Sequence, residues 1–112
     1  MKKRELFFFK DYFKAFYKVQ TTKVQQKMIW TFRIIEELER IPETYFKHIE
    51  NIEGLYEIRV QSGNDIFRIF CFFDDQNLIV VGHCFQKKSN KTPVKEIDRA
   101  IKIKKEYYNE KE

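Results

Sequence analysis

Three strand-like runs, joined by two short polar turns, constrain the fold of this chain more than any other feature. The first run, 55–61 (LYEIRVQ), alternates apolar and polar side chains, as a strand with one buried face does. The runs 65–73 (DIFRIFCFF) and 77–86 (NLIVVGHCFQ) are apolar on both faces apart from Arg68 and His83, which is typical of inner strands. The pattern predicts a three-stranded antiparallel meander.

The turns between these runs predict which residues face each other. If Gly63-Asn64 forms a two-residue hairpin loop, Arg59 lies opposite Arg68. If Asp75-Gln76 forms the next loop, Arg68 lies opposite His83. We therefore expect the two arginines and the histidine to form a row across three strands on one face of the sheet.

Such a row has two interpretations. Like charges directly opposite each other destabilise a sheet by about 0.2–1 kcal/mol, so Glu57 and other acidic residues could simply neutralise two surface arginines. Alternatively, the row is a phosphate site, in which arginine forks bind oxygens bidentately and His83 transfers a proton. Lys87 continues the row, and Lys88 and Lys91 follow in the next loop as expected phosphate-binding residues.

Length and charge limit the kinds of function. A chain of 112 residues is expected to form a single domain over residues 1–112. The formal net charge is +5, and residues 86–112 hold nine Lys or Arg against five Asp or Glu. This concentration of positive charge beside the predicted row favours a polyanionic partner.

Cysteine and histidine usage argues against a metal site. Cys71, Cys84, His48 and His83 show no metal-ligand spacing. Both thiols are expected to be small buried hydrophobes in a reducing cytoplasm. No run approaches the ~20 apolar residues of a membrane span, so we expect a soluble cytoplasmic protein without a metal or small-molecule cofactor.

The remaining segments predict one more strand and three helices. Residues 5–9 (ELFFF) should add a strand to the same sheet, and Asp11 should cap a short aromatic helix. The capping-box pattern Thr22 to Gln25 predicts a second helix, ending near Ile41 before Pro42. Its two apolar rows predict packing on both the sheet and the first helix.

The last part of the chain predicts a basic amphipathic helix. Residues 43–53 are a mixed connector, in which His48 is expected to be an exposed polar residue. Thr92-Pro93 is a strong helix start, and apolar residues then recur at helical spacing. The order strand, two helices, three antiparallel strands and C-terminal helix predicts an α+β fold.

Four segments occur in a fixed order along the second half of the chain: Leu55 to Arg59 (LYEIR), Arg68 to Phe70 (RIF), His83 to Lys88 (HCFQKK) and Lys91 to Pro93 (KTP). Together they resemble the phage-derived, HigB-like branch of the RelE/ParE toxin superfamily. The resemblance covers roughly residues 54–105, and Cys84 stands where that pattern usually has glycine.

The resemblance implies a RelE-like fold and a toxin of a type II toxin–antitoxin system. Such a toxin enters the ribosome, cuts mRNA as a metal-independent endoribonuclease, and is held inactive by a cognate antitoxin that carries a helix-turn-helix DNA-binding domain. On this reading Arg59, Arg68 and His83 are the catalytic residues. Two alternatives stay open: Lys87 or Lys88 could transfer the proton, and His83 could be a core histidine satisfied by a hydrogen bond. The superfamily also contains ParE-type toxins that poison DNA gyrase, and a phage-derived binding module without toxicity is a third possibility.

Overall fold

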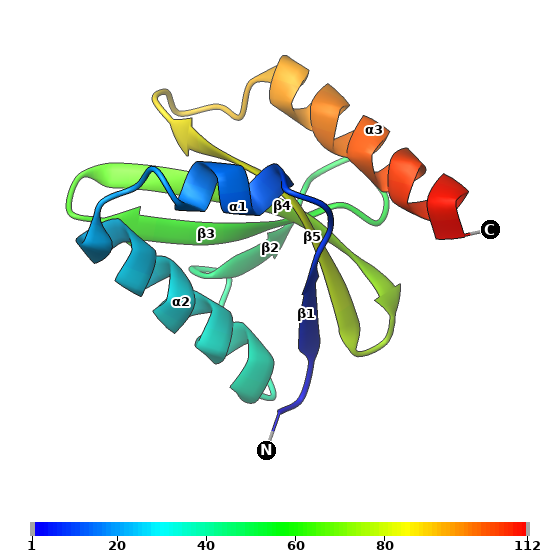
Figure 1. Cartoon of the computed structure of the whole chain (residues 1–112), viewed down its shortest axis with the longest axis horizontal. Helices are drawn as coiled ribbons and strands as arrows, with labels where there is room; N and C mark the ends of the chain where they lie inside the picture. The colour runs from blue at the N-terminus through cyan, green and yellow to red at the C-terminus, as the bar shows by residue number, and fades with distance from the viewer. Residues whose placement is uncertain (1, 112) are drawn as a thin grey trace.

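The computed structural model describes residues 2–111 and has the predicted α+β architecture (Figure 1). Its elements are β1 (Glu5–Phe8), α1 (Tyr12–Tyr17), α2 (Thr22–Glu37), β2 (Phe46–His48), β3 (Tyr56–Ser62), β4 (Asp65–Asp75), β5 (Leu78–Lys87) and α3 (Val94–Lys111). Within residues 2–111, no helix has the length and apolar character needed to cross a membrane.

All five strands belong to one sheet with the order β1-β5-β4-β3-β2. The meander β3-β4-β5 is antiparallel, as predicted, and β1 joins it in parallel with β5. Strand β2 was missed in the sequence, where residues 43–53 read as a connector. It has only three residues and pairs with β3 from Phe46↔Ile58 to His48↔Tyr56.

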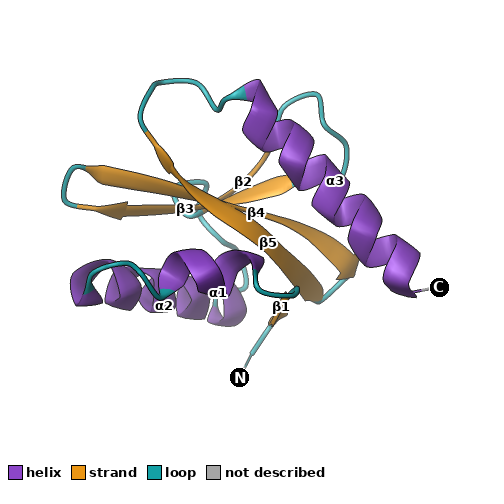
Figure 2. Ribbon diagram, turned by 45° about the horizontal axis from the view of Figure 1, so that its top comes forward, coloured by secondary structure: helices purple, strands orange, loops and turns teal. Residues whose placement is uncertain are grey.

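The helices cover opposite faces of this sheet. Figure 2 shows α1 and α2 together on one side and α3 on the other. The face beneath α1 and α2 carries the larger apolar core, in which Met28 and Ile35 of α2 pack with both buried, free cysteines. Helix α3 crosses only one end of its face, so the β3–β4 hairpin extends beyond it (Figure 2).

Helix α2 differs from its prediction at both ends and along one side. Its N-cap is Thr21, whose hydroxyl accepts a hydrogen bond from the Val24 amide, and the helix ends at Glu37, well before Pro42. The predicted row of Met28, Phe32 and Ile35 is buried. The predicted second row of Trp30, Ile34, Leu38 and Ile41 packs only in part, because Leu38 is 40% exposed whereas Ile41 packs against the core. Trp30 of that row is 43% exposed.

The predicted register is correct for one hairpin and wrong for the other. Arg59 pairs with Arg68 across a loop in which Gly63 has φ +61°, at the position where a type II′ turn places glycine. Arg68, however, faces Phe85 and not His83. Asp75 pairs with Leu78, so the β4–β5 turn is Gln76-Asn77, one residue later than predicted, and this places Phe85 opposite Arg68. The register shifts between Phe73 and Asp75 and between Ile69 and Cys71 add one residue to opposite strands, so they cancel each other at Arg68.

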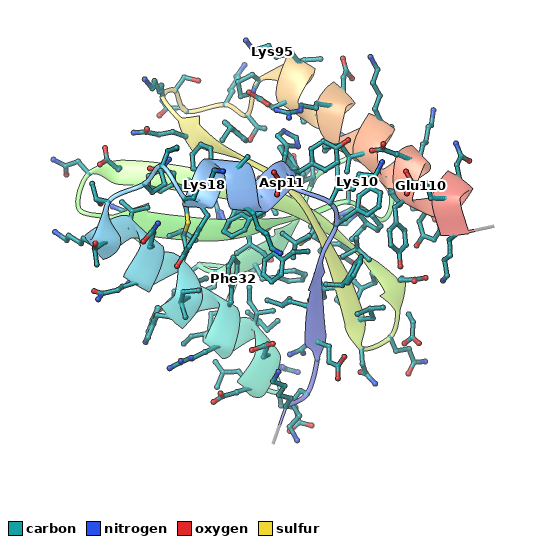
Figure 3. All side chains as sticks on the ribbon, in the orientation of Figure 1. Lys10, Asp11, Lys18, Phe32, Lys95 and Glu110 are labelled. Atoms are coloured by element: carbon teal, nitrogen blue, oxygen red, sulfur yellow. The ribbon has the colours of Figure 1, made fainter. Side chains whose placement is uncertain are left out.

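Polar contacts fix the C-terminal half of α3. Figure 3 labels Lys10 and Glu110, whose side chains form an ion pair, and Lys10 also lies 2.7 Å from Glu106. Tyr107 donates a hydrogen bond to Asp74, which also binds Lys111 at 2.6 Å. The hydrogen bond to Asp74 and partial burial raise the pKa of Tyr107 to about 12. These contacts join α3 to the chain around β1 and to the end of β4.

Candidate phosphate-binding site

Two arginines of the meander share one carboxylate. Glu57 Oε2 lies 3.1 Å from Arg59 Nε and 3.3 Å from Arg68 Nε. Glu57 and Arg68 are buried, with 8% and 7% of their surfaces exposed, whereas Arg59 is half-buried. Strand alternation places all three side chains on the face that carries α3, beyond the end of that helix.

The shared carboxylate leaves arginine donors unused. Arg59 Nη1 donates to the Glu43 carbonyl and Arg68 Nη1 to the Phe67 carbonyl, each at 3.2 Å. Both Nε atoms are buried and form no hydrogen bond with residues 2–111, because their N–H groups are not aligned with the nearby Glu57 oxygen. Buried donors without partners cost free energy, which an entering anion would recover.

Lys87 adds a third cation. It pairs with Ile66, one row beyond Arg68, and therefore lies diagonally across from that arginine on the same face. Desolvation and the charge of Arg68 lower the pKa of Lys87, while Glu57 opposes the shift. Three positive charges against one carboxylate leave this group, which we call the cationic cluster (Glu57, Arg59, Arg68 and Lys87), with a net charge of +2.

The cluster opens into a cleft of about 580 Å³ that passes around the edge of β3. Arg59 and Arg68 form one wall, and Lys27 and Tyr45 form another. Lys27 and Tyr45 were not identified as site residues from the sequence, because they lie far from the meander along the chain. No local sequence pattern marks Lys27 or Tyr45 as part of a site with the arginines of the meander.

His83 lies apart from this cleft, although it was predicted to complete the arginine row. Its side chain is 1% exposed, and Nε2 lies 3.0 Å from Glu96 Oε1 of α3. Burial lowers the pKa of His83, and Arg99 adds to that effect, while Glu96 opposes it. A neutral ring that donates from Nε2 leaves Nδ1 as an acceptor, and Nδ1 is buried without a partner within residues 2–111.

The other predicted phosphate-binding lysines are exposed. Lys88 and Lys91 lie in the loop between β5 and α3, directly after Lys87. Both side chains are exposed to solvent and lie outside the cationic cluster. In the part of the chain that the structure describes, no group of three or more His, Cys, Asp or Glu side chains is placed to hold a metal ion.

Comparison with known families supports a relationship to toxins. A protein-family model described as phage-derived protein Gp49-like (DUF891) matches residues 14–105. This family is related to the RelE/HigB toxins of toxin–antitoxin systems. A search of curated proteins finds no match. The matched range contains every residue of the cationic cluster, together with His83, Lys88 and Lys91.

Proposed function

We propose that this chain, which belongs to the phage-derived Gp49-like family, is the toxin of a type II toxin–antitoxin system and cleaves mRNA on the ribosome. One observation carries the proposal: buried Arg68 and half-buried Arg59 share a single carboxylate beside Lys87, and the buried Nε atom of each has no hydrogen-bond partner within residues 2–111. A sheet gains no stability from this excess positive charge unless an anion binds there. An RNA phosphate fits the bidentate geometry of arginine.

RNA cleavage without a metal uses the 2′-hydroxyl as nucleophile. The O2′–P bond forms and the P–O5′ bond breaks, so a base must take the 2′ proton and an acid must protonate O5′. Arg59 and Arg68 would stabilise the negative charge that develops on the phosphorane, because preorganised cations are most effective in a water-poor site. The products are a 2′,3′-cyclic phosphate and a 5′-hydroxyl.

We assign proton transfer to Lys87 in preference to His83. Lys87 lies next to Arg68, and its lowered pKa brings it closer to the range in which a lysine exchanges protons at neutral pH. His83 is covered by α3 and bonded to Glu96, so it would reach a phosphate only after α3 moved. Lys88 and Lys91 are proposed to bind neighbouring phosphates or ribosomal RNA.

Family membership suggests an antitoxin partner. We propose that an acidic antitoxin segment covers the cationic cluster or blocks entry to the ribosome, since opposite charges favour association. The antitoxin is expected to carry a helix-turn-helix DNA-binding domain. Binding that weakens as the salt concentration rises supports this arrangement, whereas salt-independent binding places the contact on an apolar surface.

The proposed activity is tested with purified ribosomes and a reporter mRNA, with DNA gyrase assayed in parallel. We expect mRNA fragments only when ribosomes are present, and unchanged supercoiling by gyrase. Lys87→Ala should reduce fragmentation, whereas the matched control Lys102→Ala, which replaces an exposed lysine of α3, should not. Intact mRNA together with inhibited gyrase would favour the ParE-type alternative. If neither target is affected and induction leaves bacterial growth unchanged, the chain is a binding module.

A further inference from the structure

Trp30 and Tyr45 form an aromatic pair on the α2 side of the sheet edge. Their ring centroids are 5.5 Å apart with an interplanar angle of 78°. Lys27 Nζ lies 4.2 Å from the centroid of the Trp30 ring, which is a cation–π contact. Trp30 nevertheless remains 43% exposed, so a large aromatic surface faces solvent beside a positive charge.

This aromatic pair is connected to the cationic cluster. A second depression of about 490 Å³, lined by Trp30 and Lys27, shares Gln61 and Gly63 with the cleft that contains Arg59 and Arg68. The two hollows therefore form one groove around β3. β2 pairs with β3 only as far as Ile58, and one further backbone hydrogen bond, from the Arg59 amide to the Tyr45 carbonyl at 2.8 Å, joins the two segments. The groove is open because this pairing leaves the rest of the β3 edge uncovered by β2.

We propose that this groove binds single-stranded RNA, with bases next to the cluster-bound phosphate stacking on Tyr45 and Trp30. The inference rests on the proposed function and adds a base-binding subsite to it. Grooves that bind single strands combine cations along the backbone with aromatic rings on which bases stack, and both features occur here. Lys27 is placed to contact a phosphate between the stacked bases and the arginines.

A protein partner fits this groove less well than RNA. Apart from Trp30, the second depression is lined by polar or basic side chains and the hairpin glycine, and the groove leads to a buried cluster of positive charge. Grooves that bind an amphipathic helix are instead lined mainly by apolar side chains. Stacking also gives little sequence preference, because every base has an aromatic face. The subsite should therefore strengthen binding of any single strand.

Trp30 is the only tryptophan in the chain, so its fluorescence reports on this subsite alone. The probe is a fluorescein-labelled 2′-O-methyl RNA hexamer, which cannot be cleaved by 2′-hydroxyl attack. We expect the unlabelled hexamer to quench Trp30 and an abasic hexamer to quench it much less. By anisotropy, Trp30→Ala should weaken binding roughly 5- to 150-fold, the range of one lost base stack, and Trp30→Phe should have a smaller effect.

The matched control is Ile29→Ala, which shortens an apolar residue of α2 with similar exposure, 39%. Thermal unfolding of each variant checks that the fold is kept. Failure of the wild-type chain to bind the hexamer, or equal affinity of the Trp30→Ala and Ile29→Ala variants, overturns the subsite. If Trp30→Ala affects only antitoxin binding, the surface is a protein-docking site and the proposal is also overturned. Ribosomal cleavage that continues in these cases leaves the proposed function standing.

Discussion

Replacing Glu57 with glutamine tests whether one carboxylate holds the cationic cluster together. The change keeps the shape of the side chain but removes the negative charge that lies 3.1 Å from Arg59 Nε and 3.3 Å from Arg68 Nε. At an effective dielectric constant of 20, each contact corresponds to a Coulomb energy of about 5 kcal/mol before desolvation is subtracted. Loss of one partner of a fully buried pair costs about 3–5 kcal/mol.

The expected loss is smaller than that, because Arg59 is partly exposed and its charge is screened by water. We expect Glu57→Gln to lower the free energy of unfolding by about 2 kcal/mol, or Tm by roughly 8 °C for a domain of this size. The assay is thermal unfolding in chloride and in phosphate at equal ionic strength. Phosphate at ten times the Kd of the wild type should stabilise the wild type by about 1.4 kcal/mol, and the same phosphate concentration should stabilise the variant more, because loss of the carboxylate strengthens anion binding.

The exposed Glu50 gives the matched control, Glu50→Gln. If Glu57→Gln changes stability no more than this control does, Glu57 does not hold the arginines. If phosphate stabilises the wild type and the variant no more than chloride does, the cluster does not bind anions and the proposed site loses its physical basis.

Four further predictions concern Arg68, Lys87, Lys88 and His83. Arg68→Leu should change the free energy of unfolding by less than about 1 kcal/mol, because Glu57 keeps Arg59 as a partner, while abolishing mRNA cleavage by the same preparation. Lys87→Arg keeps the charge but cannot transfer a proton, so it should slow single-turnover cleavage by roughly 10²- to 10⁴-fold, whereas Lys88→Ala should raise KM only. The lowered pKa of His83 means that the unfolded chain takes up the proton first, so stability is fully present above about pH 6.5 and is lost as the pH falls below it. His83→Gln should flatten that loss in pH-dependent denaturant unfolding, and an unflattened profile would assign the loss to other groups.

The sequence predicted those parts of the fold that depend on local turns and periodicity. Gly63 fixed the β3–β4 hairpin, so the Arg59–Arg68 pair followed from counting residues on either side of it. The neutralising role considered for Glu57 is also present in the structure. One carboxylate sits between two arginines without cancelling their charge, and the interpretation of the row as a phosphate site stays a prediction.

The β4–β5 register could not be predicted in the same way. Both strands are apolar on both faces, so no alternation shows that the turn is Gln76-Asn77, one residue later than predicted, which places Phe85 instead of His83 opposite Arg68. Tyr45 was missed because the contribution of β2 depends on tertiary pairing and not on local pattern. The exposure of Trp30 likewise depends on which part of the shared sheet face each of α1 and α2 covers, and local sequence periodicity does not show this.

The central claim is that the cationic cluster promotes attack of an RNA 2′-hydroxyl on the neighbouring phosphate. The most direct measurement places a single 2′-deoxyribose at the mapped cleavage position of an mRNA on purified ribosomes. We predict that the wild-type chain cuts the all-ribose mRNA to a 2′,3′-cyclic phosphate and a 5′-hydroxyl, and does not cut at the deoxyribose. Cleavage that persists at the deoxyribose, or fragments that end in a 3′-hydroxyl, would contradict the claim.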